Sequence, residues 1–187
     1  MDTQRLSQTV QPLLAWYRGH ARTLPWRADR EPYHVWLSEI MLQQTRVEAV
    51  RGYYARFLAA APDVFALAAL PEAQLLKLWE GLGYYSRARN LQKAAKIVTE
   101  QYGGQFPRTY DGLCALPGIG DYTAGAVASI AFGIPAPAVD GNVLRVFARL
   151  YNDDADVMNP ATKRLFTERV LAQMPKATPG PYNEALM

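Results

Sequence analysis

Apolar side chains in this sequence recur every three to four residues along most of its length. That spacing places them on one face of an α-helix, whereas a half-buried β-strand would need strict alternation of apolar and polar residues. No sustained alternation of that kind is present. Three windows carry the helical pattern: Leu6, Val10, Leu13, Leu14 and Tyr17; Val47, Val50, Tyr54, Phe57 and Leu58; and Leu75, Leu76, Leu78, Trp79 and Leu82. The sequence therefore predicts an all-α fold.

Proline and glycine divide the rest of the chain into further helical segments. We expect helices at about residues 33–44, 87–102, 109–115, 121–132, 142–151 and 160–174. Residues 179–187 read as a turn followed by the start of a helix, and the sequence stops before that helix completes two turns. This pattern predicts a C-terminally truncated chain.

Length and composition limit the class of protein. A chain of 187 residues can bury a substantial core and corresponds to one domain, or to one domain of two small lobes. No apolar run reaches the roughly eighteen residues of a membrane span, and no basic segment followed by an apolar one opens the sequence. We therefore expect an intracellular protein with no membrane partner. The single cysteine, Cys114, excludes an internal disulfide framework and cannot alone hold a metal cluster.

Residues 116–127 predict a glycine hairpin that opens directly into a helix. Gly118 and Gly120 can adopt positive φ and lack a Cβ, so backbone N–H groups can approach a ligand where the helix begins. That geometry suits a phosphate. No lysine or arginine lies between Leu116 and Val139, so backbone amides rather than side-chain charge would hold the phosphate. The alternative is a tight turn between two packed helices.

Positive charge is modest in total and local in its distribution. The formal net charge is +3 and the pI is about 9.0. Four cations, Arg87, Arg89, Lys93 and Lys96, fall in a stretch without acidic residues. A DNA-binding surface and a solvated helix face explain this stretch almost equally well.

Two carboxyl groups lie in contrasting surroundings. Glu39 belongs to an unusually apolar helical segment, with Val35 and Trp36 one turn before it. Partial desolvation there would raise its pKa toward the range of a general acid. Asp140 stands at an expected helix start, where backbone amides would hold it ionised. One protonated and one ionised carboxyl group suit cleavage of a glycosidic bond. The alternatives are a solvent-facing helix residue for Glu39 and an ordinary N-cap for Asp140.

Several motifs in a fixed order cover nearly the whole chain, at residues 24–27, 38–45, 81–91, 116–127, 139–143 and 182–187. Together they resemble the helix-hairpin-helix DNA glycosylase superfamily, and within it the adenine DNA glycosylases of the MutY type. The resemblance implies two helical lobes that flank a DNA-binding cleft. One is a six-helix lobe, residues 27–136, that contains the hairpin. The other combines residues 1–26 and 137–187 and is truncated before an iron–sulfur cluster loop.

The resemblance also implies a substrate, adenine mispaired with 8-oxoguanine or guanine in duplex DNA, which leaves as the free base. Matched by motif, Glu39 would protonate the imidazole-ring nitrogen of the extruded adenine, and Asp140 would stabilise the sugar cation. Tyr122 would support the intermediate, and Asn142 would help hold the catalytic water or Asp140. Four more residues would border the adenine: Trp26, Arg27, Leu42 and Glu184.

A further set would contact the DNA around the lesion. Gln44, Thr45 and Tyr84 would contact the 8-oxoguanine or wedge beside it, since extruding a base costs a few kcal/mol and leaves a gap in the stack. The alternatives are core packing for Tyr84 and a solvated helix residue for Gln44. The DNA-binding prediction also includes Arg87, Gly118 and Gly120.

One position separates two branches of the superfamily. In the endonuclease III-like branch, a lysine in the first turn after the hairpin attacks the sugar and gives strand cleavage. Here that position is Tyr122, which implies a monofunctional glycosylase. The alternatives are an endonuclease III-like oxidised-pyrimidine glycosylase and AP lyase, or a non-catalytic helix-hairpin-helix DNA-binding module.

The chain departs from the family pattern in its metal ligands. The resemblance implies a 4Fe-4S cluster for the full-length family member, but the four cysteines are absent here, and Cys114 matches none of them. We therefore expect no metal site in this chain. A monomer is the default expectation, with a cytoplasmic or nucleoid-associated location if the protein is bacterial.

Overall fold

The computed structural model describes residues 8–187, and Leu6 lies outside that range. It consists of one short 3-10 helix, η1, and eleven α-helices, with no strand among the described residues. In chain order these are α2 Val10–His20, η1 Pro25–Arg27, α3 Pro32–Leu42, α4 Val47–Ala60, α5 Val64–Ala69, α6 Glu72–Trp79, α7 Ser86–Tyr102, α8 Tyr110–Cys114, α9 Asp121–Phe132, α10 Gly141–Tyr151, α11 Pro160–Gln173 and α12 Pro179–Leu186. The all-α prediction is confirmed.

Most predicted helices match the structure to within two residues at each end. Three predictions were wrong in detail. The six-residue helix α5 was not recognised, so residues 27–136 contain seven α-helices rather than six. Helix α6 ends at Trp79, three residues before Leu82, and α12 already begins at Pro179, where a turn was expected before the helix. A proline at the first helical position explains the early start, because its missing N–H and fixed φ both suit that place.

Local capping chemistry sets several helix starts. The Asp63 carboxylate accepts a hydrogen bond from the Ala66 amide at 2.8 Å at the start of α5. The Thr109 hydroxyl accepts one from the Gly112 amide at 3.1 Å at the start of α8. Such side-chain acceptors satisfy amides that have no partner in the first turn. They end the preceding loops at defined residues and so fix where each helix presents its side chains.

Two separate clusters of buried apolar side chains stabilise the fold. The larger runs from Leu24 to Ala138 and includes the fully buried Trp36, Phe57 and Trp79. The smaller joins α2 to the C-terminal helices, through residues such as Leu14, Phe147, Phe166 and Tyr182. The lobe boundaries at residues 26/27 and 136/137 stay a prediction.

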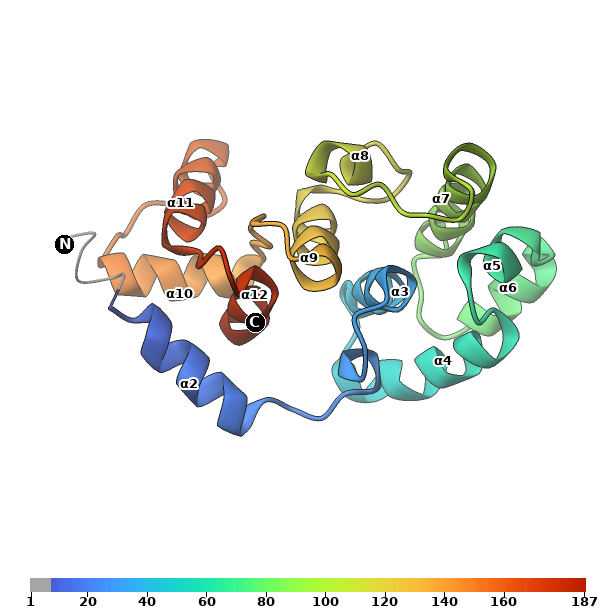
Figure 1. Ribbon diagram of the computed structural model, residues 1–187, viewed down its shortest axis with the longest axis horizontal. Helices are drawn as coiled ribbons and strands as arrows, with labels where there is room; N and C mark the ends of the chain where they lie inside the picture. The colour runs from blue at the N-terminus through green and yellow to red at the C-terminus, as the bar shows by residue number, and fades with distance from the viewer. Residues whose placement is uncertain (1–7) are drawn as a thin grey trace.

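Helices α3 and α9 pack against each other near the middle of the molecule, and α12 packs against α9 from the other side (Figure 1). Helix α3 is buried almost all round, from Tyr33 to Met41 with one half-buried residue. An acid on such a helix cannot face bulk water. Through the packing of α3, α9 and α12, the buried Glu39 of α3 lines the same cavity as Asp140 at the start of α10. No described helix is long and apolar enough to cross a membrane.

Candidate active site

A cavity of about 220 Å³ lies where η1, α3, α9, α10 and α12 meet. It brings together nine of the residues that the sequence predicted for the site: Glu39, Asp140, Tyr122, Asn142, Trp26, Arg27, Leu42, Glu184 and Thr45. These residues come from segments that are as far apart in sequence as Trp26 and Glu184. Their convergence on one cavity is a tertiary feature that no single motif contains.

Glu39 is the buried acid of this cavity, with 8% of its surface exposed. Burial raises the pKa of Glu39 to about 7, because the charged form loses its water. Hydrogen bonding to Tyr122 and the charge of Arg27 oppose the shift, while Glu184 and Asp140 add to it. A substantial fraction of Glu39 is therefore protonated near neutral pH, as a general acid requires.

Asp140 occupies the N-cap of α10, and its carboxylate has two hydrogen-bond partners. One oxygen accepts from the Val143 amide at 2.8 Å, and the other accepts from the Asn142 side-chain amide at 3.0 Å. These two bonds fix the carboxylate at the start of α10, where the positive end of the helix dipole lies. The N-cap geometry that served as the alternative reading is present, and the same geometry presents the carboxylate to the cavity.

Tyr122 lies in the first turn of α9, half-buried in the cavity wall. Its hydroxyl donates to the Met187 sulfur at 3.2 Å. Burial raises the pKa of Tyr122, and the nearby Glu39 raises it further. The phenol therefore keeps its proton at neutral pH and acts as a hydrogen-bond donor.

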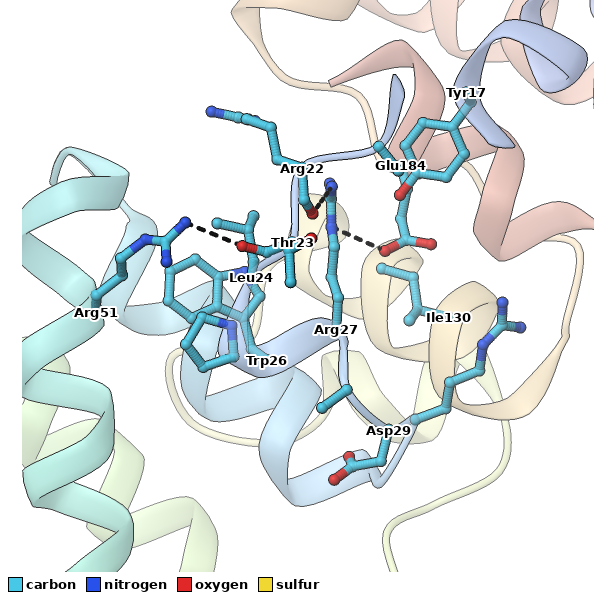
Figure 2. Close-up of a pocket in the computed structure, with 14 residues that line it drawn as sticks. Tyr17, Arg22, Thr23, Leu24, Trp26, Arg27, Asp29, Arg51, Ile130 and Glu184 are labelled. Carbon is cyan, nitrogen blue, oxygen red and sulfur yellow. Dashed lines mark hydrogen bonds and ion pairs between the residues drawn. The ribbon is translucent and has the colours of Figure 1, made fainter. Parts of the chain in front are cut away.

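An ion pair closes one side of the cavity. The Arg27 Nε lies 3.2 Å from a Glu184 carboxylate oxygen, and the Arg27 guanidinium also lies over the Tyr17 ring at 5.5 Å. Figure 2 shows this pair between η1 and α12, at the border of a second cavity of about 600 Å³. Burial raises the pKa of Glu184, and Arg27 opposes that shift. The two cavities share Arg27, Glu184, Trp26 and Ile130 among their lining residues.

The buried amide of Asn183 fixes the loop that leads to Asp140. Its side-chain oxygen accepts from the Ala138 amide at 3.2 Å, and its side-chain nitrogen donates to the Ala136 carbonyl at 2.9 Å. Gly125 allows the same loop to approach α9 closely, since a Cβ there would lie 2.1 Å from the Pro137 carbonyl oxygen. Asn183 also directly precedes Glu184 in the sequence. One buried residue therefore helps to position the carboxylates of both Asp140 and Glu184.

Gln44 and Tyr84 lie outside the cavity and are exposed, Tyr84 by 65%. Both adopt left-handed backbone conformations, with φ of 57° for Gln44 and 46° for Tyr84. Thr45 is half-buried, lines the cavity, and donates its hydroxyl proton to the Gln43 carbonyl at 3.3 Å. The exposure of Tyr84 rules out the core-packing alternative.

The two hairpin glycines differ in conformation. Gly118 has φ of 79°, and a Cβ there would lie 2.8 Å from the Asn90 Cβ, so both backbone angle and space require glycine. Gly120 has φ of −96° and open space around it, and it serves as the N-cap of α9. Of the two glycines that can adopt positive φ, only Gly118 does so, because only the first glycine makes the turn.

Arg87 is turned inward rather than toward solvent. Its guanidinium donates to the carbonyl oxygens of Ile40 at 2.8 Å, Gln43 at 2.6 Å and Leu82 at 2.9 Å. A guanidinium engaged in this way has no free face for a phosphate. The structure thus corrects the assignment of Arg87 as a DNA contact, because its two Nη groups donate to the protein backbone and its Nε is buried.

Comparison with known proteins agrees with this site. The model of the HhH-GPD superfamily of base excision DNA repair proteins matches residues 37–172, which include the hairpin, Glu39 and Asp140. The chain belongs to this superfamily.

Among curated members of related sequence, the adenine DNA glycosylase of Buchnera aphidicola is 40% identical over 178 residues, covering 95% of this chain and 50% of that protein. The adenine DNA glycosylase of Homo sapiens is 44% identical over 184 residues, covering 94% of this chain and 34% of that protein. The predicted resemblance to adenine DNA glycosylases is confirmed. The chain spans half or less of the length of these relatives.

Solved structures of the superfamily share the fold. A thermostable thymine-DNA glycosylase superposes with a TM-score of 0.84 at 28% identity, covering all of this chain and 87% of that one. A non-covalent endonuclease III–DNA complex superposes with a TM-score of 0.81 at 25% identity, covering all of this chain and 84% of that one. The helix-hairpin-helix glycosylase fold predicted from the sequence is therefore confirmed.

Sequence reasoning missed several residues of this HhH-GPD site. Arg22, Ser38, Val47, Ile130 and Met187 also line the smaller cavity. Ser38 and Met187 belong to motifs that were recognised, and Arg22 shortly precedes one, so their position was a usable signal. Val47 and Ile130 are apolar side chains that helical periodicity assigns simply to the core.

No group of three or more histidine, cysteine or acidic side chains within residues 8–187 is arranged to hold a metal ion. Cys114, the sole cysteine of the sequence, lies half-buried on α8, where burial raises the pKa of its thiol. A single thiol does not fit an iron–sulfur cluster, which needs several thiolates. The residues described here therefore do not provide the cluster that the resemblance implies for the full-length family member.

Proposed function

We propose that this chain is the glycosylase portion of a base excision repair enzyme that removes adenine mispaired with 8-oxoguanine or guanine from double-stranded DNA. The observation that carries the proposal is that Glu39 and Asp140 line a single cavity. Glu39 is buried, and the Asp140 carboxylate accepts a hydrogen bond from a backbone amide at the start of α10. Curated relatives named adenine DNA glycosylases support the choice of adenine.

The chemistry follows from the two environments. Protonated Glu39 donates its proton to an imidazole-ring nitrogen of the extruded adenine, which makes the base a better leaving group. The bond between the sugar C1′ and the base nitrogen then breaks, and the ionised Asp140 stabilises the cationic sugar. A water held near Asn142 adds to C1′ and gives its proton to a cavity carboxylate. The products are free adenine and an abasic site.

The reaction stops at the abasic site because the cavity offers no amine nucleophile. Tyr122 stands in the first turn after the hairpin, and no lysine lines the cavity among residues 8–187. A lyase would need such an amine to form a Schiff base with the sugar. This composition disfavours an endonuclease III-like lyase, and the buried acid disfavours a non-catalytic DNA-binding module.

The oligomeric state, the location and the implied metal cluster are part of the same proposal. The enzyme acts as an intracellular monomer on duplex DNA, and the 4Fe-4S cluster implied for the full-length family member would need cysteines that this chain does not contain. No step of the proposed reaction passes through that cluster.

Single-turnover base release tests the proposal. We expect the chain to release adenine opposite 8-oxoguanine, with strand breaks only after alkali, and to leave an oxidised pyrimidine untouched. Glu39→Gln should lower the rate by about 100-fold to 10,000-fold while preserving DNA binding. Glu48→Gln, an exposed acid on α4, is the matched control. Pyrimidine release with spontaneous nicking, or full activity of Glu39→Gln, would contradict the proposal.

A further inference from the structure

Arg87, in the first turn of α7, connects two loops that are distant in sequence. Its Nη1 donates to the carbonyl oxygens of Ile40 and Gln43 at 2.8 and 2.6 Å, at the end of α3. Its Nη2 donates to the carbonyl oxygens of Leu82 and Gly83 at 2.9 and 3.3 Å, in the loop between α6 and α7. One guanidinium thus holds the backbone of both loops.

Each loop continues directly into a residue with a left-handed backbone. Gln44 follows Gln43 with φ of 57°, and Tyr84 follows Gly83 with φ of 46°. This conformation is uncommon for residues other than glycine and persists only where the surroundings enforce it. The third example among residues 8–187, Asn152, ends helix α10, where an asparagine in this conformation is ordinary.

The side chains of these two residues point outward while their backbones are held from within. Tyr84 is 65% exposed and Gln44 is also exposed. The Arg87 guanidinium lies 5.7 Å from the Tyr84 ring centroid and 5.4 Å from that of the buried Trp79. The Trp79 indole donates to the Gly83 carbonyl at 3.1 Å and supports the same loop.

We propose that Arg87 is a positioning residue that holds Gln44 and Tyr84 as a preformed pair of wedges for the DNA stack. The inference rests on the proposed function, in which an adenine leaves the helix and its purine partner stays. Residues ordered before binding do not lose conformational freedom when DNA arrives, so more of the contact energy is available for extrusion. Arg87 itself contacts no DNA.

Geometry explains why this position needs arginine. The planar guanidinium presents donors along two directions and so reaches two loops at once, whereas a lysine ammonium is a single point charge. Without Arg87, the carbonyls of Ile40, Gln43 and Leu82 would have to find other donors, whereas Gly83 would keep the Trp79 indole. We therefore expect Arg87→Lys to retain the charge and to lose the connection between the loops.

The test compares base release from two duplexes. In the first, adenine is paired opposite 8-oxoguanine; in the second, it lies opposite an abasic analogue and is already unpaired, so that extrusion costs less. We expect Arg87→Met and Arg87→Lys to slow release from the first duplex by about 10-fold to 100-fold, and from the second by less than about 3-fold. Arg89→Met is the matched control, because Arg89 lies on the same helix, exposed and paired with Glu72 at 2.8 Å.

Coupling to Gln44 and Tyr84 separates positioning from general structural damage. In a background that carries both Gln44→Ala and Tyr84→Ala, Arg87→Lys should cost less than about 3-fold, because both wedges that it positions are already gone. Equal losses on both duplexes, or full additivity with that double substitution, would overturn the inference. Circular dichroism checks folding, and Arg87→Lys serves alone if Arg87→Met does not fold.

The inference and the proposed function fail in different ways. A wild-type chain that releases no adenine from either duplex contradicts the function. Insertion of the wedges into the base stack is then measured separately, by the fluorescence of 2-aminopurine placed next to the mismatch at saturating protein. Arg87→Lys should lower that signal at least about 3-fold while Arg89→Met leaves it unchanged, and equal signals for both variants would overturn the wedge as well.

Discussion

Arg27 and Glu184 join the two ends of the described chain across the active-site cavity, with 3.2 Å between the guanidinium Nε and a carboxylate oxygen. Arg27 belongs to η1 and Glu184 to α12. Both line the cavity that contains Glu39, and they act on it with opposite signs. The charge of Glu184 raises the pKa of Glu39, and the charge of Arg27 lowers it.

Neutralising each partner should therefore shift the pH profile in opposite directions. Glu184→Gln removes a negative neighbour, so the pKa of Glu39 falls and activity is lost at a lower pH than in the wild type. Arg27→Met removes a positive neighbour, so the pKa of Glu39 rises and activity persists to a higher pH. Single-turnover rates measured between pH 5 and 9 give both midpoints.

The control for this pair is Arg51→Met. Arg51 lines the neighbouring larger cavity and donates to the Thr23 carbonyl at 3.0 Å. It is not among the charges that act on Glu39. A shift of the same sign in both Glu184→Gln and Arg27→Met would show that the pH profile does not report Glu39.

Burial of Glu39 should also make folding stability depend on pH. Its pKa is about 7 in the folded protein, against an ordinary value of 4.5, so the folded state binds the proton more tightly than the unfolded chain. The stabilising contribution is fully present below pH 4.5 and is lost as the pH rises through about 7. Glu39→Gln should lose this dependence. Its unfolding free energy relative to that of the wild type should rise by on the order of 3 kcal/mol between pH 4.5 and 8. Denaturant unfolding at a series of pH values measures it.

Glu48→Gln gives the comparison for that series, because Glu48 is exposed on α4. Its stability should follow the wild type at every pH. If the difference in unfolding free energy between Glu39→Gln and the wild type did not vary with pH, the pKa of Glu39 would be the same in the folded and unfolded states, and Glu39 would be ionised at neutral pH. It would then be unsuited to act as an acid at neutral pH.

The parts of this site that the sequence predicted are those fixed by local chemistry. Asp140 bonds to an amide three residues ahead, so its role as a cap is contained in a short segment. The apolar neighbours of Glu39 are also adjacent in sequence, and they predict the burial that raises its pKa. The family roles of Gln44 and Tyr84 came from resemblance rather than from the residues themselves.

The parts that the sequence did not predict depend on contacts between distant segments. Arg87 reads as one of several cations on a helix, and only the folded chain brings carbonyls of the α3 terminus within its reach. Helix α5 is too short for periodicity to reveal. Gly118 and Gly120 look equivalent in the motif, although packing against Asn90 makes only the first depend on glycine.

Two substitutions at Asp140 separate its charge from its cap. Asparagine is as good an N-cap as aspartate, so Asp140→Asn should fold with nearly unchanged stability and still lose about 100-fold or more in base release. Asp140→Ala should lose the same activity and also about 1 kcal/mol of stability, because the Val143 amide loses its acceptor. Thermal unfolding and single-turnover rates provide the comparison, and an active Asp140→Asn would exclude a need for the negative charge.

The hairpin glycines provide a matched pair for testing the DNA grip. Gly118→Ala places a Cβ at φ of 79° and 2.8 Å from the Asn90 Cβ, so we expect a loss of stability of more than about 1 kcal/mol. Gly120→Ala meets no atom within 4 Å at φ of −96°, so its stability should change by less than about 0.5 kcal/mol.

DNA affinity then shows what the hairpin does. If the backbone amides at the start of α9 hold a phosphate, the new methyl group of Gly120→Ala stands at the N-cap beside that phosphate and weakens binding in a protein of normal stability. Fluorescence anisotropy with a labelled duplex at fixed salt measures the change, because phosphate contacts depend on salt. Wild-type affinity of Gly120→Ala would indicate that the hairpin is only a turn between packed helices. No protein atom lies within 4 Å of the added methyl group, so only DNA bound to the backbone amides could contact it.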